Sequence, residues 1–304
     1  GKTVDSDLLA RLPQAKGRLL RVLIELAGQR QISEAVAPVV ASLVSTEAGI
    51  RDEAVQTIGI IGQDRQAVDL VKLLGQTNSS TQRKGIEKAL LAICGRSGDS
   101  CIPHLQPLTT SSDDELRMIG LHALAIIGGS DALATVKSAV DNAKPAVQDE
   151  AVRILSTWPN NWPDDDSAGQ ALEKLAKSAE KMSHQVLGLR GYLQYIRGNK
   201  KLGAEEKTAR VKDALSYVKR PEERRQAIAV LGEAPSASAL ELLTTLAEDS
   251  AVVEEAYSAM AQIAGQNIRG VSRQQRRQVL QTVVEKSGND STRRRARKAL
   301  SGIK

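Results

Sequence analysis

A short block of three apolar or small residues recurs along the chain and constrains its fold more than any other feature. In each block these residues stand at positions 0, +4 and +7, and a glycine or proline usually follows. Clear copies begin at Ala54, Gly120, Ala151, Ala227, Ala256 and Ala296, and looser copies begin at Leu19, Ile86 and Leu189. The spacing places the three side chains on one face of an α-helix. The glycine or proline that follows is a helix stop signal.

A second, shorter apolar segment follows most of the stops, over residues 67–74, 132–140, 168–179, 237–246 and 273–284. Each repeat is therefore predicted to be a helix, a tight turn and an antiparallel second helix. One such pair cannot bury its apolar faces alone, whereas stacked pairs share a continuous core. The sequence predicts an all-α, right-handed α-α superhelix of about eight helix pairs plus a closing helix. Residues 1–304 are expected to form a single solenoid, with a lead-in over 1–15 and the closing helix over 290–304.

The composition agrees with an all-α fold. Phenylalanine is absent and aromatic residues make up 2% of the chain, whereas strands favour aromatic and β-branched residues. A single helical bundle would not need a stop signal in every repeat, and TPR repeats need aromatic and proline positions that this chain lacks. No apolar run reaches the length of a transmembrane helix, about 18 residues.

Three blocks resemble HEAT repeats, including the bacterial type that is grouped with phycobilin lyases. They begin Arg51-Asp-Glu-Ala-Val, Glu115-Leu-Arg and Gln148-Asp-Glu-Ala-Val, and the resemblance covers about residues 16–304. The segment from Thr157 to Tyr192 looks like exported HEAT proteins of environmental bacteria. The resemblance implies a HEAT-like solenoid. It is specific for architecture rather than for function, because HEAT arrays have many roles.

Cys94 and Cys101 are the only cysteines. They are expected at the two ends of an intra-repeat turn, where their Cα atoms can lie at the separation of about 6 Å that a disulfide needs. We expect a disulfide, and with it an oxidising compartment, periplasmic or extracellular. The alternative is a pair of half-buried free thiols, as is common in cytoplasmic proteins. Zinc binding is disfavoured because no histidine partners lie nearby.

The sequence contains no recognisable catalytic constellation. His104, His122 and His184 lie in three different repeats and form neither the His-Glu dipeptides of HEAT-type metal hydroxylases nor a His-x-x-x-His pair. No phosphate-binding glycine loop and no nucleophile elbow is present. We therefore expect no catalytic residues, no metal, no cofactor and no enzymatic activity. A role in tetrapyrrole attachment is suggested only by the phycobilin-lyase-type resemblance, and no motif supports it.

The loop of residues 158–167 contains both tryptophans. Trp158 is at a +7 position and is expected in the core. Trp162 is off the pattern, so it either covers the end of a helix pair or offers a stacking surface to a partner. The three aspartates at 164–166 precede a helix predicted to begin near Ala168, and carboxylates there cap a helix and favour its dipole. They lack the alternating ligand spacing of a calcium loop.

The formal net charge of +6 is concentrated in residues 181–304, which hold 23 basic and 13 acidic residues. Four arginines cluster at and just before the last second helix: Arg269, Arg273, Arg276 and Arg277. Such asymmetry indicates an anionic partner, or alternatively helix faces that are simply solvated.

The leading hypothesis is a non-catalytic scaffold that binds a protein partner on the concave surface of the solenoid. The basic cluster suggests that this partner is acidic. The candidate partner-binding residues are Arg269, Arg273, Arg276, Arg277 and Trp162. The alternative is a nucleic-acid-binding or HEAT-like DNA-repair protein, similar to DNA glycosylases. Both tryptophans, however, lie far along the chain from the basic cluster.

Overall fold

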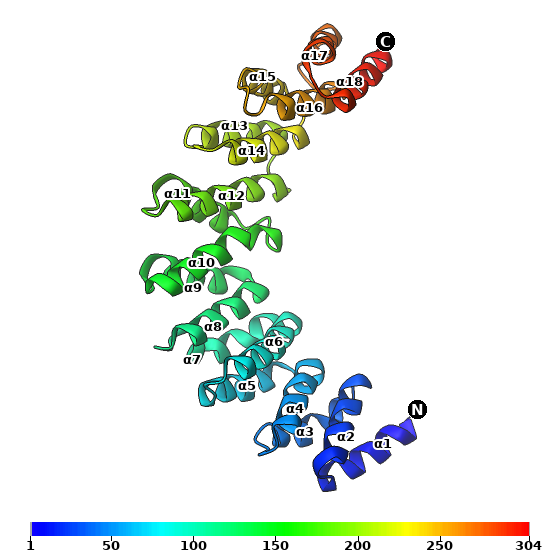
Figure 1. Ribbon diagram of the computed structural model, residues 1–304, viewed down its shortest axis with the longest axis vertical. Helices are drawn as coiled ribbons and strands as arrows, with labels where there is room; N and C mark the ends of the chain where they lie inside the picture. The colour runs from blue at the N-terminus through cyan, green and yellow to red at the C-terminus, as the bar shows by residue number, and fades with distance from the viewer. Residues whose placement is uncertain (1, 304) are drawn as a thin grey trace. The chain divides into compact units, whose positions relative to one another are not determined.

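The computed structural model describes residues 2–303, which are mainly helical and contain no strand (Figure 1). A lead-in helix, α1 (Lys2–Arg11), and a 3₁₀ turn (Leu12–Gln14) come first. The helices that follow, in chain order, are α2 (Gly17–Gln29) and α3 (Val36–Ser42), α4 (Ala48–Ile61) and α5 (Asp64–Gln76), α6 (Ser80–Ser97) with a 3₁₀ segment (Gly98–Leu105) and α7 (Gln106–Thr109), α8 (Asp114–Ile127) and α9 (Gly129–Asn142), α10 (Pro145–Thr157) and α11 (Asp166–Ser178), α12 (Met182–Gly198) and α13 (Ala204–Leu215), α14 (Pro221–Glu233) and α15 (Ala237–Leu246), α16 (Val253–Ala264) and α17 (Arg273–Lys286), and α18 (Asp290–Gly302). The predicted all-α fold of helix pairs and a closing helix is confirmed.

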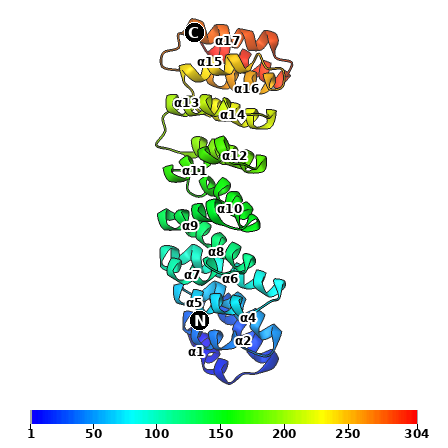
Figure 2. The same ribbon diagram turned by 90° about the vertical axis from the view of Figure 1, so that its left-hand side faces the viewer.

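The chain divides into two compact units, with the division after Ile154. Unit 1 contains α1 to α9 and most of α10, and unit 2 contains α11 to α18. Each unit is an array of stacked helix pairs, which Figure 2 shows as successive layers. That residues 1–304 form one continuous solenoid stays a prediction. Among residues 2–303, no helix combines the length and the apolar character needed to span a membrane.

Within each unit the even-numbered helices pack directly on one another. In unit 1, α2 contacts α4, α4 contacts α6 and α6 contacts α8, and in unit 2 the same row runs from α12 through α14 and α16 to α18. Successive odd-numbered helices contact each other more weakly. We call α12, α14, α16 and α18 the even-numbered row of unit 2.

The core follows the 0/+4/+7 pattern from α4 onward. In α4, Ala54 and Ile58 are fully buried and Ile61 nearly so, and the other blocks are likewise buried, apart from the half-buried Leu300 in α18. Small residues at position 0 allow close approach. A Cβ atom on Gly120 would come within 3.0 Å of side-chain atoms from the neighbouring α7.

The register expected for the first repeat is wrong. Leu19 and Leu26 are 56% and 38% exposed, and α2 instead buries Ile24 and Ala27 completely. The block in α2 therefore begins one residue later, at Leu20, and Gly28 stands immediately after its +7 position, as Gly62 does in the next repeat. Leu19 and Leu26 lie together on one side of the true core face and imitate its spacing.

Candidate functional site

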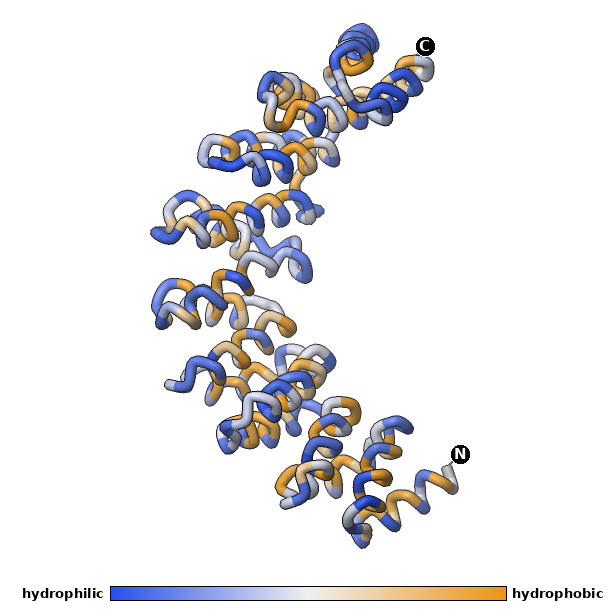
Figure 3. Tube along the Cα trace, viewed as in Figure 1, coloured by the Kyte–Doolittle hydropathy of each residue, from blue (hydrophilic) through white to orange (hydrophobic). Residues whose placement is uncertain are grey.

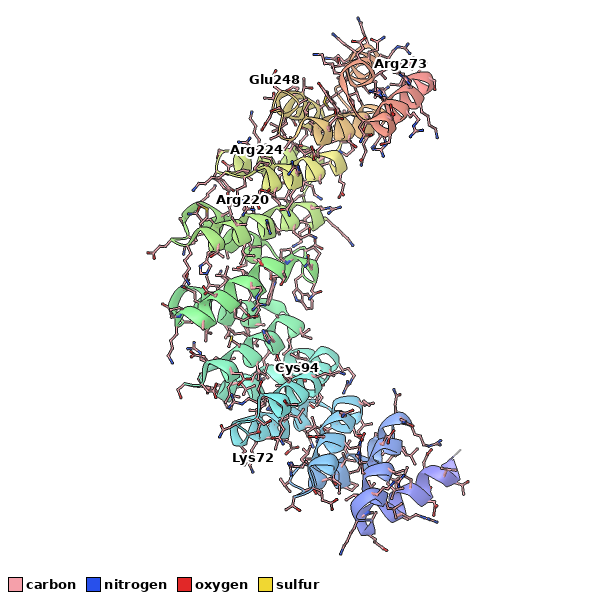
Figure 4. All side chains as sticks on the ribbon, viewed as in Figure 1. Lys72, Cys94, Arg220, Arg224, Glu248 and Arg273 are labelled. Atoms are coloured by element: carbon pink, nitrogen blue, oxygen red, sulfur yellow. The ribbon has the colours of Figure 1, made fainter. Side chains whose placement is uncertain are left out.

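The basic cluster found in the sequence lies around the start of α17. This helix begins at Arg273 after a capping box, in which the Ser272 hydroxyl accepts a bond from the Gln275 backbone and the Gln275 side chain accepts one from Ser272. Arg273, labelled in Figure 4, and Arg269 are both exposed. Arg277 is also exposed, and its guanidinium donates to the carbonyl of Ile303 at 2.6 Å. That bond holds the first turns of α17 beside the end of α18.

Arg276 does not belong to this surface. The sequence predicts that Arg276 faces a partner, but this arginine is only 7% exposed. Its Nη1 atom donates to the carbonyl of Gln266 at 2.6 Å, and its Nε atom is buried without a hydrogen-bond partner. Arg276 therefore ties the loop before α17 to the helix, which is a structural role.

A second group of cations lies on α18, outside the candidate partner-binding residues named from the sequence. The helix buries Thr292 and Ala296. On the opposite side Arg294, Arg297 and Lys298 are exposed, and within residues 2–303 none of the three makes an ion pair or a side-chain hydrogen bond. We call these three residues the α18 basic face. Figure 3 shows α17 and α18 as strongly hydrophilic segments.

The α18 basic face could have been found from spacing alone. Positions 294, 297 and 298 are related by three and four residues and so share one helix face. Arg293 points elsewhere, because its guanidinium donates to the carbonyl of Ser287 at 2.8 Å and pairs with Asp290.

Trp162 lies in the loop between α10 and α11, with the pairs α12/α13 and α14/α15 separating it from α17 in the chain. It is half-buried, and its backbone N–H donates to the carbonyl of Trp158 at 3.0 Å as part of a turn. Trp158 is in the core as predicted, 2% exposed. Its indole N–H donates to Asp165 at 3.1 Å. The structure therefore does not bring Trp162 to the basic cluster.

The three aspartates of this loop have structural roles. Asp165 caps α11, as the sequence predicts for a carboxylate in this position. Asp166 accepts bonds from the Tyr195 hydroxyl at 2.8 Å and from Asn199 at 3.1 Å, and Asp164 accepts one from the backbone of Lys200 at 2.8 Å. The Tyr195 hydroxyl holds the pKa of Asp166 below its usual value, while burial raises the pKa of Tyr195. These bonds dock the loop onto the end of α12.

The predicted disulfide is wrong. Cys94 on α6 (labelled in Figure 4) and Cys101 in the 3₁₀ segment after it are neighbouring, fully buried free thiols. Burial raises the pKa of both thiols, and for Cys94 the nearby Cys101 adds to the rise. Both are therefore protonated and contact each other as thiols. The argument from the cysteines for an oxidising compartment disappears with the bond.

His122 links three successive repeats of unit 1. Its Nδ1 atom is 2.6 Å from a carboxylate oxygen of Glu87 on α6, and its Nε2 atom is 2.8 Å from one of Glu150 on α10. Carboxylates only accept hydrogen bonds, so both ring nitrogens donate in this arrangement when the ring carries two protons. No group of side chains within residues 2–303 has the composition and arrangement to hold a metal ion.

Similar charged links join other neighbouring repeats. Buried Arg83 on α6 donates to Asp113 at 2.8 Å and to Glu115 at 2.5 Å at the start of α8. In unit 2, Arg190 bonds Glu223 at 3.0 Å. The α18 basic face differs from these links because its cations have no such partner on the described chain.

Comparisons with known proteins identify the architecture. No protein-family model and no curated protein matches the chain. Among solved structures, a chain of the AP-3 complex is 13% identical over 90% of this chain and 52% of its own length, with a TM-score of 0.63. Kap95p, from its structure with RanGDP, is 12% identical over 99% of this chain and 44% of its own, with a TM-score of 0.54. A Kap121p mutant is 15% identical over 99% and 37%, with a TM-score of 0.52.

This chain thus spans about half the length of the AP-3 chain and less than half of the other two. At these identities the likeness shows the fold alone. The chain is a helical-repeat solenoid whose structural neighbours are HEAT-repeat solenoids.

Proposed function

We propose that the chain is a non-catalytic scaffold that binds an acidic partner protein at α18, the last helix of the even-numbered row of unit 2. The observation that carries the proposal is the α18 basic face: Arg294, Arg297 and Lys298 are exposed and make no ion pair within the described chain. Arginine guanidinium groups suit carboxylates because they can donate two parallel hydrogen bonds. A partner that supplies carboxylates would complete this surface.

The arginines around the start of α17 extend the same end of unit 2. The bond from Arg277 to Ile303 brings the first turns of α17 beside the last residues of α18. Arg273 is one helical turn before Arg277, and Arg269 precedes it in the loop. A concentration of exposed cations steers an acidic surface toward the site and raises the rate of association at low salt.

Solenoids of this architecture commonly hold other proteins on their inner surface. Among the structural neighbours, Kap95p binds RanGDP, and Kap121p has been solved bound to Pho4p. The α18 basic face lies on the last helix of the even-numbered row of unit 2. We also retain membership of the phycobilin-lyase-type HEAT group as a proposal, which rests on the three sequence blocks alone.

A protein partner is favoured over nucleic acid. Sequence-tolerant binding of single strands uses aromatic side chains on which the bases stack. In residues 253–303 the only aromatic residue is Tyr257, which is 7% exposed. The surface therefore offers charge without a stacking platform.

The test compares a triple charge reversal, Arg294→Glu, Arg297→Glu and Lys298→Glu, with a matched control of Arg18→Glu, Arg65→Glu and Lys72→Glu. The control residues are exposed cations of unit 1 without ion pairs, and Lys72 is labelled in Figure 4. The two triple variants differ from the wild-type protein by the same net charge. Binding of a fluorescent polyglutamate peptide is measured by anisotropy at two salt concentrations.

We expect the wild-type and control proteins to bind the peptide, and the α18 variant to bind it about tenfold more weakly with an unchanged melting temperature. Equal weakening in both variants would show only a net-charge effect and would contradict the assignment. A duplex DNA probe is measured in parallel. DNA binding that is stronger than peptide binding and is lost in the α18 variant would favour the nucleic-acid alternative.

A further inference from the structure

A cavity of about 450 Å³ lies in unit 1 between α7, α8 and α9. It is far in the chain from the basic surface proposed above. Its polar lining consists of one cation, Arg117, and four hydroxyl groups, those of Thr109, Thr110, Thr135 and Ser138. No acidic side chain lines it. A volume of this size is typical of sites for small organic molecules, about 300–1,000 Å³.

Arg117 is distinguished from the comparable arginines by its lack of a partner. Within residues 2–303, seven arginines are buried or half-buried. Six of them donate to a carboxylate or a backbone carbonyl: Arg51, Arg83, Arg210, Arg224, Arg276 and Arg293. Arg117 alone has no side-chain hydrogen bond and no ion pair in the described chain. A guanidinium that is partly withdrawn from water normally finds an acceptor, because its five donors are otherwise left unsatisfied.

The acidic residues nearest to Arg117 in sequence are engaged elsewhere. Asp113 and Glu115 both accept hydrogen bonds from Arg83 on α6. Asp114 pairs with Lys144, whose ammonium lies 3.3 Å from its carboxylate. The local sequence thus places three carboxylates close to Arg117, but the fold commits each of them to another cation.

We infer that this cavity binds a small organic oxyanion, a carboxylate or a phosphate monoester, with Arg117 as its principal ligand. The guanidinium matches the paired oxygens of either group. The hydroxyl of Ser138, which has no hydrogen-bond partner within the described residues, can donate a further bond. The hydroxyls of Thr110 and Thr135 donate to the backbone carbonyls of Gln106 and Asp131 at 2.8 and 3.1 Å.

The remaining wall of the cavity explains why the ligand should be organic. Leu121 on α8 and Ala134 and Ala139 on α9 present apolar surface beside the polar groups. Inorganic phosphate would leave this apolar surface exposed to water, whereas the aromatic or aliphatic group of an organic anion would cover it. Burial of that group contributes roughly 25 cal/mol to the binding free energy for each Å² of apolar surface removed from water.

The experiment measures binding of four probes by calorimetry: phenyl phosphate, benzoate, inorganic phosphate and the neutral benzyl alcohol. We expect both organic anions to bind the wild-type protein at millimolar or lower concentration, more tightly than inorganic phosphate and far more tightly than benzyl alcohol. Arg117→Gln should weaken the binding of phenyl phosphate about tenfold or more. Arg65→Gln, which removes an exposed, unpaired arginine on α5, should leave binding unchanged.

A second variant keeps the inference testable if Arg117→Gln fails to fold. Ala134 is an exposed residue of α9, so Ala134→Leu should fill the cavity without disturbing the core and should abolish binding while Arg117 remains. The inference is overturned if no organic anion binds the wild-type protein. It is also overturned if Ala134→Leu or a folded Arg117→Gln binds phenyl phosphate as well as wild type does, or if benzyl alcohol binds equally well.

Discussion

Gly188 on α12 is predicted to be irreplaceable even by alanine. A Cβ atom built on this residue would lie 2.7 Å from the Cβ of Leu175 and 2.8 Å from the backbone nitrogen of Ala176, both on the facing helix α11. Neither atom can rotate away, because each is part of a helix backbone or is attached directly to it. Gly188→Ala must therefore push α11 and α12 apart.

The magnitude follows from two opposing effects. Alanine is favoured over glycine in a helix interior by about 1 kcal/mol. Overpacking a close contact costs about 1–3 kcal/mol and more where the structure cannot adjust. Because the contacts at Gly188 are with backbone and Cβ atoms, the upper end of that range applies. We expect Gly188→Ala to lower the free energy of unfolding by about 2 kcal/mol.

Gly85 on α6 provides the matched control. It is also inside a helix, but a Cβ atom built there meets nothing within 4 Å. Gly85→Ala should therefore show the helix-propensity gain alone, a stabilisation of about 0.5–1 kcal/mol.

Urea denaturation measures both variants. Trp158 and Trp162 lie in unit 2 with α11 and α12, so tryptophan fluorescence follows the Gly188 variant, while far-UV circular dichroism follows both. A Gly188→Ala protein as stable as wild type or more so would refute the reasoning. It would mean that the two helices can separate at little cost.

Three further predictions concern polar links, each measured by chemical denaturation. His122→Leu should destabilise unit 1 by about 1–2 kcal/mol, because buried Glu150 loses its imidazole partner and keeps only its ion pair with Arg153, and adding Glu150→Gln should restore part of the loss. Arg83→Gln should cost about 2 kcal/mol at neutral pH. Because Arg83 holds the pKa of Asp113 below its usual value, this contribution is present above pH about 4 and is lost as the pH falls through the lowered pKa, so the difference from wild type should shrink in acid. Tyr195→Phe should cost about 1 kcal/mol by removing one hydrogen bond to an aspartate. Equal stability of any variant and wild type at neutral pH would contradict the corresponding link.

The helix pairs could be predicted from the sequence because their signal is local. Each block carries its own apolar face and its own stop residue, as Ala54 to Gly62 does. The prediction for the first repeat failed because Leu19 and Leu26, which lie beside the true core face on one side, also fit the pattern. The decisive clue was Gly28, which stands just after Ala27 and marks the correct register.

The candidate sites were harder to predict because they depend on which charges find partners across repeats. Arg276 and Arg277 are adjacent in sequence, yet one is buried and the other exposed. Arg117 follows three acidic residues, and nothing local shows that Arg83 and a lysine occupy all of them. The cysteines show the same limit, since proximity in a turn does not determine whether two buried thiols are joined.

The cross-repeat links also bear on how such a chain can change its length during evolution. The bonds from Arg83 to Glu115, from His122 to Glu150 and from Arg190 to Glu223 span 32, 28 and 33 residues, about one repeat each. The repeat of α8 thus carries an acceptor, Glu115, for the repeat before it and a donor, His122, for the repeat after it. Duplication or loss of one whole module in frame would leave most of these pairs with their original partners. Selection would then have to repair the chemistry of a single new junction rather than redesign the array.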